Sequence, residues 1–172
     1  MAQIVLAAFG LMFLLDAIDK VSHLRRSIDS ISSYELLPQP LHGVAAVLLA
    51  ITGFAAGAAL LGRISVGAAA AVGAGLQLLF ALGMAINLIR GRRDLECGCG
   101  TAASGQRLQW RLVMRNVVVA VVLVAAAATD DVGAPLSVAE VLPGAFGLAL
   151  VYLAVSAVWA SGSQQQWRLG SM

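Results

Sequence analysis

Charged residues are scarce in this chain: they make up 12% of its 172 residues, whereas hydrophobic residues make up 60%. Soluble domains carry about 25% charged residues, so this composition excludes an ordinary soluble protein and predicts an integral membrane protein. The length suits about four or five crossings, because each crossing needs about 20 apolar residues. No room remains for a large soluble domain.

Basic residues are also few, and the formal net charge is only +2. The arginines stand next to apolar segments and do not alternate with aromatic residues, so no nucleic-acid-binding surface is expected. The first residues lack a basic region and a small-residue cleavage site. We therefore expect the first apolar run to be kept as a helix and not removed as a signal peptide.

Apolar runs of membrane-spanning length recur along the chain. They predict an all-α integral membrane protein in which four helices form a transmembrane bundle and a fifth helix crosses near the C-terminus. We assign residues 1–128 to the four-helix domain and residues 129–172 to the fifth helix with its polar tail. The predicted runs are 3–24, 43–61, 66–89, 112–128 and 139–160.

Charged residues interrupt the second half of the first run. Asp16 and Lys20 are four residues apart, as are Asp19 and His23, so all four share one helix face about 100° wide. Charged groups at membrane depth are costly, and they normally face the bundle interior and pair. Two readings stay open: a buried pair of Asp16 with Lys20 near the site, or a helix that ends near Asp16.

Residues 25–42 are polar and contain two prolines, which end any helix, although Ile28 and Leu36 belong to an apolar side. We expect a loop on the membrane surface, which either caps a site between helix ends or merely connects two helices. In the next runs, Gly53 and Gly57 predict a face that another helix approaches closely. A polar stripe on the third run is expected to face the bundle, for packing or for cofactor contact; it comprises Gln77, Met84 and Asn87.

Cysteine is nearly absent, and both cysteines, Cys97 and Cys99, flank Gly98 between the third and fourth runs. Structural zinc needs four ligands, which two cysteines and two distant histidines cannot easily supply, so no metal site is expected. Copper(I) bound by two thiolates is chemically feasible, but nothing else in the sequence supports it. Two unrelated structural cysteines are a further alternative.

A redox role for the two thiols has the stronger physical support. A disulfide between residues two apart closes a small, strained ring, for which Gly98 supplies backbone freedom, and strained disulfides are the oxidising ones. Nearby arginines favour the reactive thiolate, although Asp94 and Glu96 partly offset them. These arginines are Arg90, Arg92, Arg93 and Arg107.

The chain resembles the MauE family of methylamine-utilisation membrane proteins, which is related to the DoxX-like redox membrane proteins. The resemblance is carried by Tyr-Glu-Leu-Leu-Pro at 34–38, by the segment 87–100 and by Arg115 with Asn116. One departure is Gly100, where the family usually has a large apolar residue. The resemblance implies a four-helix core similar to vitamin K epoxide reductase, in which thiols pass electrons to a membrane quinone, ubiquinone or menaquinone.

The same resemblance implies a thiol:quinone oxidoreductase with Cys97 and Cys99 as the catalytic pair. A thioredoxin-like protein of the MauD type is the expected electron donor, and a disulfide-rich periplasmic protein such as methylamine dehydrogenase is the expected beneficiary. The implied neighbours of the quinone are Asp16, Lys20, Asn87, Arg90, Arg115 and Asn116.

Two lines of argument predict opposite orientations in the membrane. The first loop and the cysteine segment share the arginine-rich side, which the positive-inside rule places in the cytoplasm. The resemblance, and the reducing state of the cytosol, place the cysteines in the periplasm, and we expect that orientation in the bacterial inner membrane. Two other functions stay open: a non-catalytic assembly factor or transporter subunit with a structural disulfide, and oxidation of sulfur compounds by the same thiols.

Overall fold

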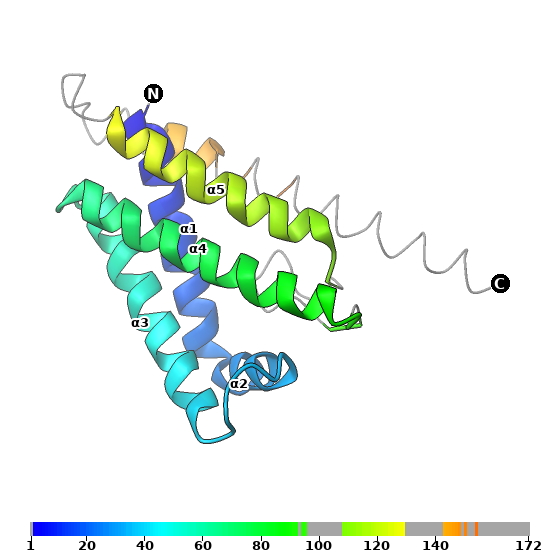
Figure 1. Cartoon of the computed structure of the whole chain (residues 1–172). Coiled ribbons are helices and arrows are strands. Elements are labelled where there is room, and N and C mark those ends of the chain that lie inside the picture. Colours follow the sequence, from blue (N-terminus) through cyan, green and yellow to red (C-terminus); the bar gives the residue numbers. More distant parts are fainter. Residues whose placement is uncertain are drawn as a thin grey trace.

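The computed structural model describes residues 2–92, 94–95, 108–129, 143–148, 150 and 154. The regular elements in this part of the chain are helices, which confirms the all-α prediction there. They are α1 (Ala2–Ser22), α2 (Leu24–Ser33), α3 (Leu41–Leu61), α4 (Val66–Ile89) and α5 (Trp110–Ala128) (Figure 1).

Three of these helices, α3, α4 and α5, are long and apolar enough to cross a membrane. The chain is therefore a multi-pass membrane protein. Helix α1 has the same length as α3, 21 residues, but carries the charged residues of the first run. The predicted fifth crossing, 139–160, lies largely outside the described residues; within it, 143–148 are helical and Ala145 packs against Ala7 and Ala8 of α1.

The segment 25–42 was expected to be a loop, and this expectation is wrong for its first part, which belongs to the helix α2. Ile28 and Ile31 are three residues apart and so share one helix face, while the prolines at 38 and 40 lie beyond the end of the helix. Helix α2 packs against α3 and buries none of its residues completely. This is the arrangement of a helix lying on the outside of the bundle.

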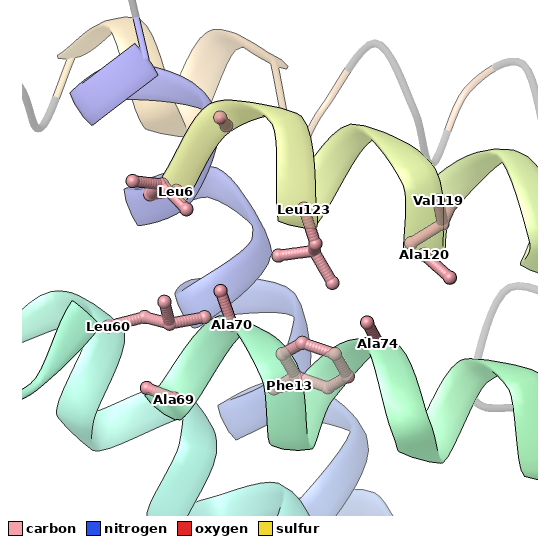
Figure 2. Packing of buried hydrophobic residues seen from close by; sticks show 10 residues of the cluster. Leu6, Phe13, Leu60, Ala69, Ala70, Ala74, Val119, Ala120 and Leu123 are labelled. Atoms are coloured by element: carbon pink, nitrogen blue, oxygen red, sulfur yellow. The ribbon is translucent and has the colours of Figure 1, made fainter. Parts of the chain in front are cut away.

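The long helices pack as two pairs, α1 along α3 and α4 along α5, and α3 also contacts α4 (Figure 1). Figure 2 shows the core between the pairs, where Phe13 of α1 lies beside α4 and Leu123 approaches from α5. A Cβ atom on Gly73 would lie 2.8 Å from the Phe13 ring, so the missing side chain makes room for that ring. The buried members of this core are Leu6, Phe13, Leu60, Ala69, Ala70, Ala74, Val119, Ala120, Leu123 and Ala126.

Helices α1 and α3 touch through glycines. A Cβ atom on Gly57 would lie 2.8 Å from the backbone oxygen of Gly10, and one on Gly53 would lie 4.0 Å from the Cβ of Ala17. The predicted small-residue face of α3 is therefore confirmed, and its partner is α1. Such close backbone approach is the usual way in which membrane helices gain packing contacts.

We expect Gly57→Ala to lower the stability of the protein by about 1–3 kcal/mol, because the added methyl group forces the backbones of α1 and α3 apart. Gly75→Ala is the matched control, since a Cβ on Gly75 meets nothing within 4 Å. Thermal unfolding in detergent measures both variants. Equal unfolding midpoints for the two would contradict a tight contact at Gly57.

Candidate functional site

Lys20 is the only lysine in the chain, and it is buried on α1 with 7% of its surface exposed. Its ammonium group donates a hydrogen bond to the carboxylate of Asp16. The Nζ atom also lies 5.4 Å from the centroid of the Phe80 ring on α4, where a cation is attracted to the ring face. The predicted pair of Asp16 with Lys20 is present, because α1 continues through Asp16 to Ser22.

The second charged pair on this helix lies closer to solvent. Nδ1 of His23 is 3.1 Å from Oδ1 of Asp19, and half of the His23 side chain is exposed. The two pairs therefore differ in their basic member, since Lys20 is buried and His23 is half exposed, whereas the carboxylates of Asp16 and Asp19 are both partly exposed, at 29% and 23%.

Asn87 lies in the last turn of α4 and is completely buried. Its Nδ2 group donates to the backbone oxygen of Tyr34 at 3.2 Å and to that of Gly83 at 3.1 Å. Carbonyl oxygens only accept, so these two contacts fix which end of the amide carries the hydrogens. The Oδ1 atom of Asn87 is thereby left as a buried acceptor with no hydrogen-bond partner among the described residues.

Helix α4 ends in a hydrogen-bonded turn that also binds the first loop. Gly91 has a positive φ of 78°, and the Arg92 N–H donates to the backbone oxygen of Asn87 at 3.0 Å, as in a Schellman motif. The Arg92 side chain donates to Oε1 of Glu35 at 2.8 Å. The first loop and the end of α4 therefore lie at the same end of the bundle, as predicted, and one nearby arginine is paired within the protein.

Both ends of the cysteine segment are held at this end of the bundle. The Leu108 N–H donates to the Leu95 oxygen at 3.0 Å. Tyr34, Phe80 and Leu95 all pack against one apolar cluster between α4 and α5, which we call the junction cluster. Its buried members are Ala81, Met84, Leu88, Leu108, Leu112 and Val113.

The pair predicted to be catalytic, Cys97 and Cys99, lies outside the described residues. Leu95 precedes Cys97 by two residues, so the segment that carries the thiols starts from the junction cluster. Two of the arginines predicted to favour the thiolate, Arg93 and Arg107, also lie outside the described part. The roles predicted for all of these side chains stay predictions.

The remaining predicted site residues lie on α4 and α5. Asn116 is 2% exposed, and its Nδ2 is a buried donor with no hydrogen-bond partner in the described part of the chain. It follows Val113 by three residues and therefore lies on the same side of α5 as the junction cluster. Arg115 beside it is half-buried, whereas Arg90 is exposed at the end of α4.

Three contacts at this end had no signal in the sequence. The oxygen that binds Asn87 belongs to the backbone of Tyr34, and every residue has such an oxygen. Glu35 and Arg92 are 57 residues apart, so no helical spacing connects them. Phe80 looks like any other apolar residue of its run until the structure places it against Lys20.

We expect Asn87→Ala to cost about 1 kcal/mol of stability, because the backbone oxygen of Tyr34 loses its donor, while the removal of the unpaired Oδ1 atom offsets part of that loss. Glu35→Gln is the comparison, since it breaks an exposed ion pair at the same end, and exposed pairs contribute little. Unfolding in detergent followed by circular dichroism measures both. A larger loss for Glu35→Gln than for Asn87→Ala would contradict the buried amide as the main tie.

Comparisons with known proteins agree on one family. The family profile described as "Methylamine utilisation protein MauE" matches residues 1–129. The methylamine utilization protein MauE of Paracoccus denitrificans is 31% identical over 151 residues, which cover 86% of this chain and 81% of that protein. The protein of the same name from Paracoccus versutus is 32% identical over 75 residues, covering 44% and 40% of the two chains.

A third relative matches over a shorter segment at a higher sequence identity. The methylamine utilization protein MauE of Methylorubrum extorquens is 46% identical over 41 residues, which cover 24% of this chain and 22% of that protein. No solved structure matches the chain. By the profile match and the Paracoccus denitrificans relative, this chain belongs to the MauE family of methylamine utilisation proteins.

Proposed function

We propose that the protein is a membrane thiol:quinone oxidoreductase in which Cys97 and Cys99 pass electrons from a thioredoxin-like partner of the MauD type to a quinone. It would thereby support disulfide formation in periplasmic proteins such as methylamine dehydrogenase. The hydrogen bond from the Leu108 N–H to the Leu95 oxygen carries the proposal, because it holds both ends of the cysteine segment together beside the junction cluster, at the end of α4 where Asn87 lies.

The proposed reaction has two balanced halves. First, the two thiols of the partner give two electrons and two protons to the Cys97–Cys99 disulfide, so a disulfide forms in the partner and one breaks here. Then Cys97 and Cys99 lose two electrons and two protons and form their disulfide again, while ubiquinone or menaquinone accepts them and becomes the quinol.

Some of the described residues have the hydrogen-bond donors that a quinone would need. Its two oxygens are acceptors, so the site needs buried donors. Asn116 offers a buried Nδ2 with no partner among the described residues, and the Lys20 ammonium is the one buried basic group there. Asp16 holds that ammonium in place through their ion pair. Asn87, Arg90 and Arg115 complete the set proposed to surround the quinone.

We further propose that α1 is a fourth crossing, which would complete a four-helix bundle similar to vitamin K epoxide reductase. The length of α1 and its packing along α3 support this. The cysteine end is proposed to face the periplasm from the bacterial inner membrane. The pairing of Arg92 with Glu35 supports this orientation, since at least one arginine of that end has a role within the protein.

Turnover from a dithiol to a quinone tests the proposed function. The purified oxidised protein is mixed in detergent with a reduced thioredoxin-like protein and a short-chain ubiquinone, and quinol formation is followed. We expect catalytic quinol formation that stops when both cysteines are replaced by serine. If the serine variant turned over at the same rate, the proposal would be wrong.

The orientation is tested on intact cells with a membrane-impermeant thiol reagent. After mild reduction, we expect Cys97 and Cys99 to react without permeabilisation, because a periplasmic face is open to the reagent. A single cysteine placed at Arg63, in the turn at the other end of α3, is the matched control in a cysteine-free variant. Labelling of the cysteine pair only after permeabilisation would place that end in the cytoplasm.

A further inference from the structure

We infer that Asn87 makes the quinol, and not the quinone, the more tightly bound form at this site, through its unused carbonyl oxygen. This inference rests on the proposed function, since it assumes that a quinone binds beside Asn87. A site that binds the reduced form more tightly raises the potential of the bound quinone, and it therefore favours the electron-transfer step from the thiols to the quinone within the complex.

The hydrogen bonds of Asn87 decide what it offers to a ligand. An Asn side chain has two N–H donors and one acceptor oxygen. Here Nδ2 contacts two backbone oxygens, those of Tyr34 and Gly83, so both donors are used within the protein. The Oδ1 atom is buried and has no partner among the described residues. Asn87 therefore offers an acceptor and no donor.

An unsatisfied buried acceptor has a free-energy cost. A polar group that loses its water on burial and gains no hydrogen bond in exchange is unfavourable, and Oδ1 of Asn87 is such a group. A ligand that donates a hydrogen bond to Oδ1 of Asn87 removes this cost. A ligand that can only accept leaves it in place.

Quinone and quinol differ in this respect. A quinone has carbonyl oxygens, which only accept, whereas a quinol has hydroxyl groups, which also donate. Only the quinol satisfies Oδ1 of Asn87. Asn116 offers the opposite group, a buried donor, which pairs with an oxygen of either form. The preference for the reduced form therefore comes from Asn87, whereas Asn116 strengthens the binding of quinone and quinol alike.

Other buried groups do not supply the missing donor in this structure. Besides Asn87, the buried polar side chains of the described part are Gln3, Lys20 and Asn116. The Lys20 ammonium is bonded to Asp16, and no hydrogen bond joins Asn116 to Asn87. If the two amides closed on one another in the membrane, the preference for the quinol would be absent.

The test uses a redox-inert protein, so that neither form of the ligand is converted. In the double variant Cys97→Ser with Cys99→Ser, we measure the Kd of a short-chain ubiquinol and of its ubiquinone by anaerobic titration calorimetry in detergent. We expect the quinol to bind about tenfold more tightly, which corresponds to one hydrogen bond. Adding Asn87→Ala should remove the difference, and adding Asn116→Ala should weaken both forms alike.

A chemically blocked ligand tests the same hydrogen bond without a further substitution in the protein. The quinol with both hydroxyl groups methylated cannot donate, so it should bind no more tightly than the quinone. Equal affinities for quinol and quinone, or a preference that survives Asn87→Ala, would overturn the inference and leave the proposed function standing. If neither form bound at all, the proposed function would fail with it.

Discussion

Lys20→Met is expected to destabilise the protein strongly, because it leaves the carboxylate of Asp16 without its partner inside the helical bundle. Removing one member of a buried ion pair costs about 3–5 kcal/mol, and the partial exposure of Asp16 places the loss near the lower value. Replacing both members, in Asp16→Asn with Lys20→Met, should restore most of the stability, since no charge is then left alone. Denaturant unfolding in detergent measures all of these variants.

Asp19→Asn is the matched control for this pair. It removes a carboxylate of the same helix whose partner, His23, is half exposed, so the stability should change little. If Lys20→Met and the double variant unfolded at the same denaturant concentration, the pairing of Lys20 with Asp16 would not be important for stability. The double variant is also expected to reduce quinone poorly although it folds, because the proposed donor to the quinone is gone.

Cys97→Ser is expected to lower quinone reduction at least about a thousandfold, because a hydroxyl does not replace a thiolate that forms and breaks covalent bonds. The unfolding midpoint should hardly change, since a disulfide that closes so short a loop stabilises the chain least. Turnover and unfolding are measured on the same preparation. Cys99→Ser should behave in the same way.

The competing function makes a different prediction for the wild-type protein. In a non-catalytic assembly factor or transporter subunit, the disulfide would have only a structural role at the junction between α4 and α5. The wild type would then have no thiol-dependent quinone reduction to lose, and Cys97→Ser would behave like it. An active wild type with an inactive, stably folded Cys97→Ser variant therefore separates the two functions.

The sequence predicts much of the helical framework because the bilayer imposes long apolar runs. The runs 43–61 and 66–89, which are predicted from hydropathy alone, lie within α3 and α4. The spacing of Asp16 and Lys20 predicts their pairing, since residues four apart on a helix are neighbours. The small-residue face at Gly57 predicts a close helix contact but not its partner, because any helix can occupy such a face.

The sequence does not predict how the first loop meets the end of α4. The contact depends on a backbone oxygen at Tyr34 and on an ion pair between distant residues, Glu35 and Arg92. The helix α2 is also not predicted from the sequence, because the polar residues of this segment obscure the apolar spacing of Ile28 and Ile31. Such features arise from tertiary packing, which periodicity in one segment does not encode.

A single turnover without any donor tests the central claim most directly. The purified protein is fully reduced, freed of reductant and mixed anaerobically with a short-chain ubiquinone, and the free thiols and the quinol are counted together. The proposed chemistry predicts one quinol for each two thiols lost in the wild type and none in Cys97→Ser. Thiols that stay reduced, or equal quinol formation by the variant, would contradict a redox role for Cys97 and Cys99.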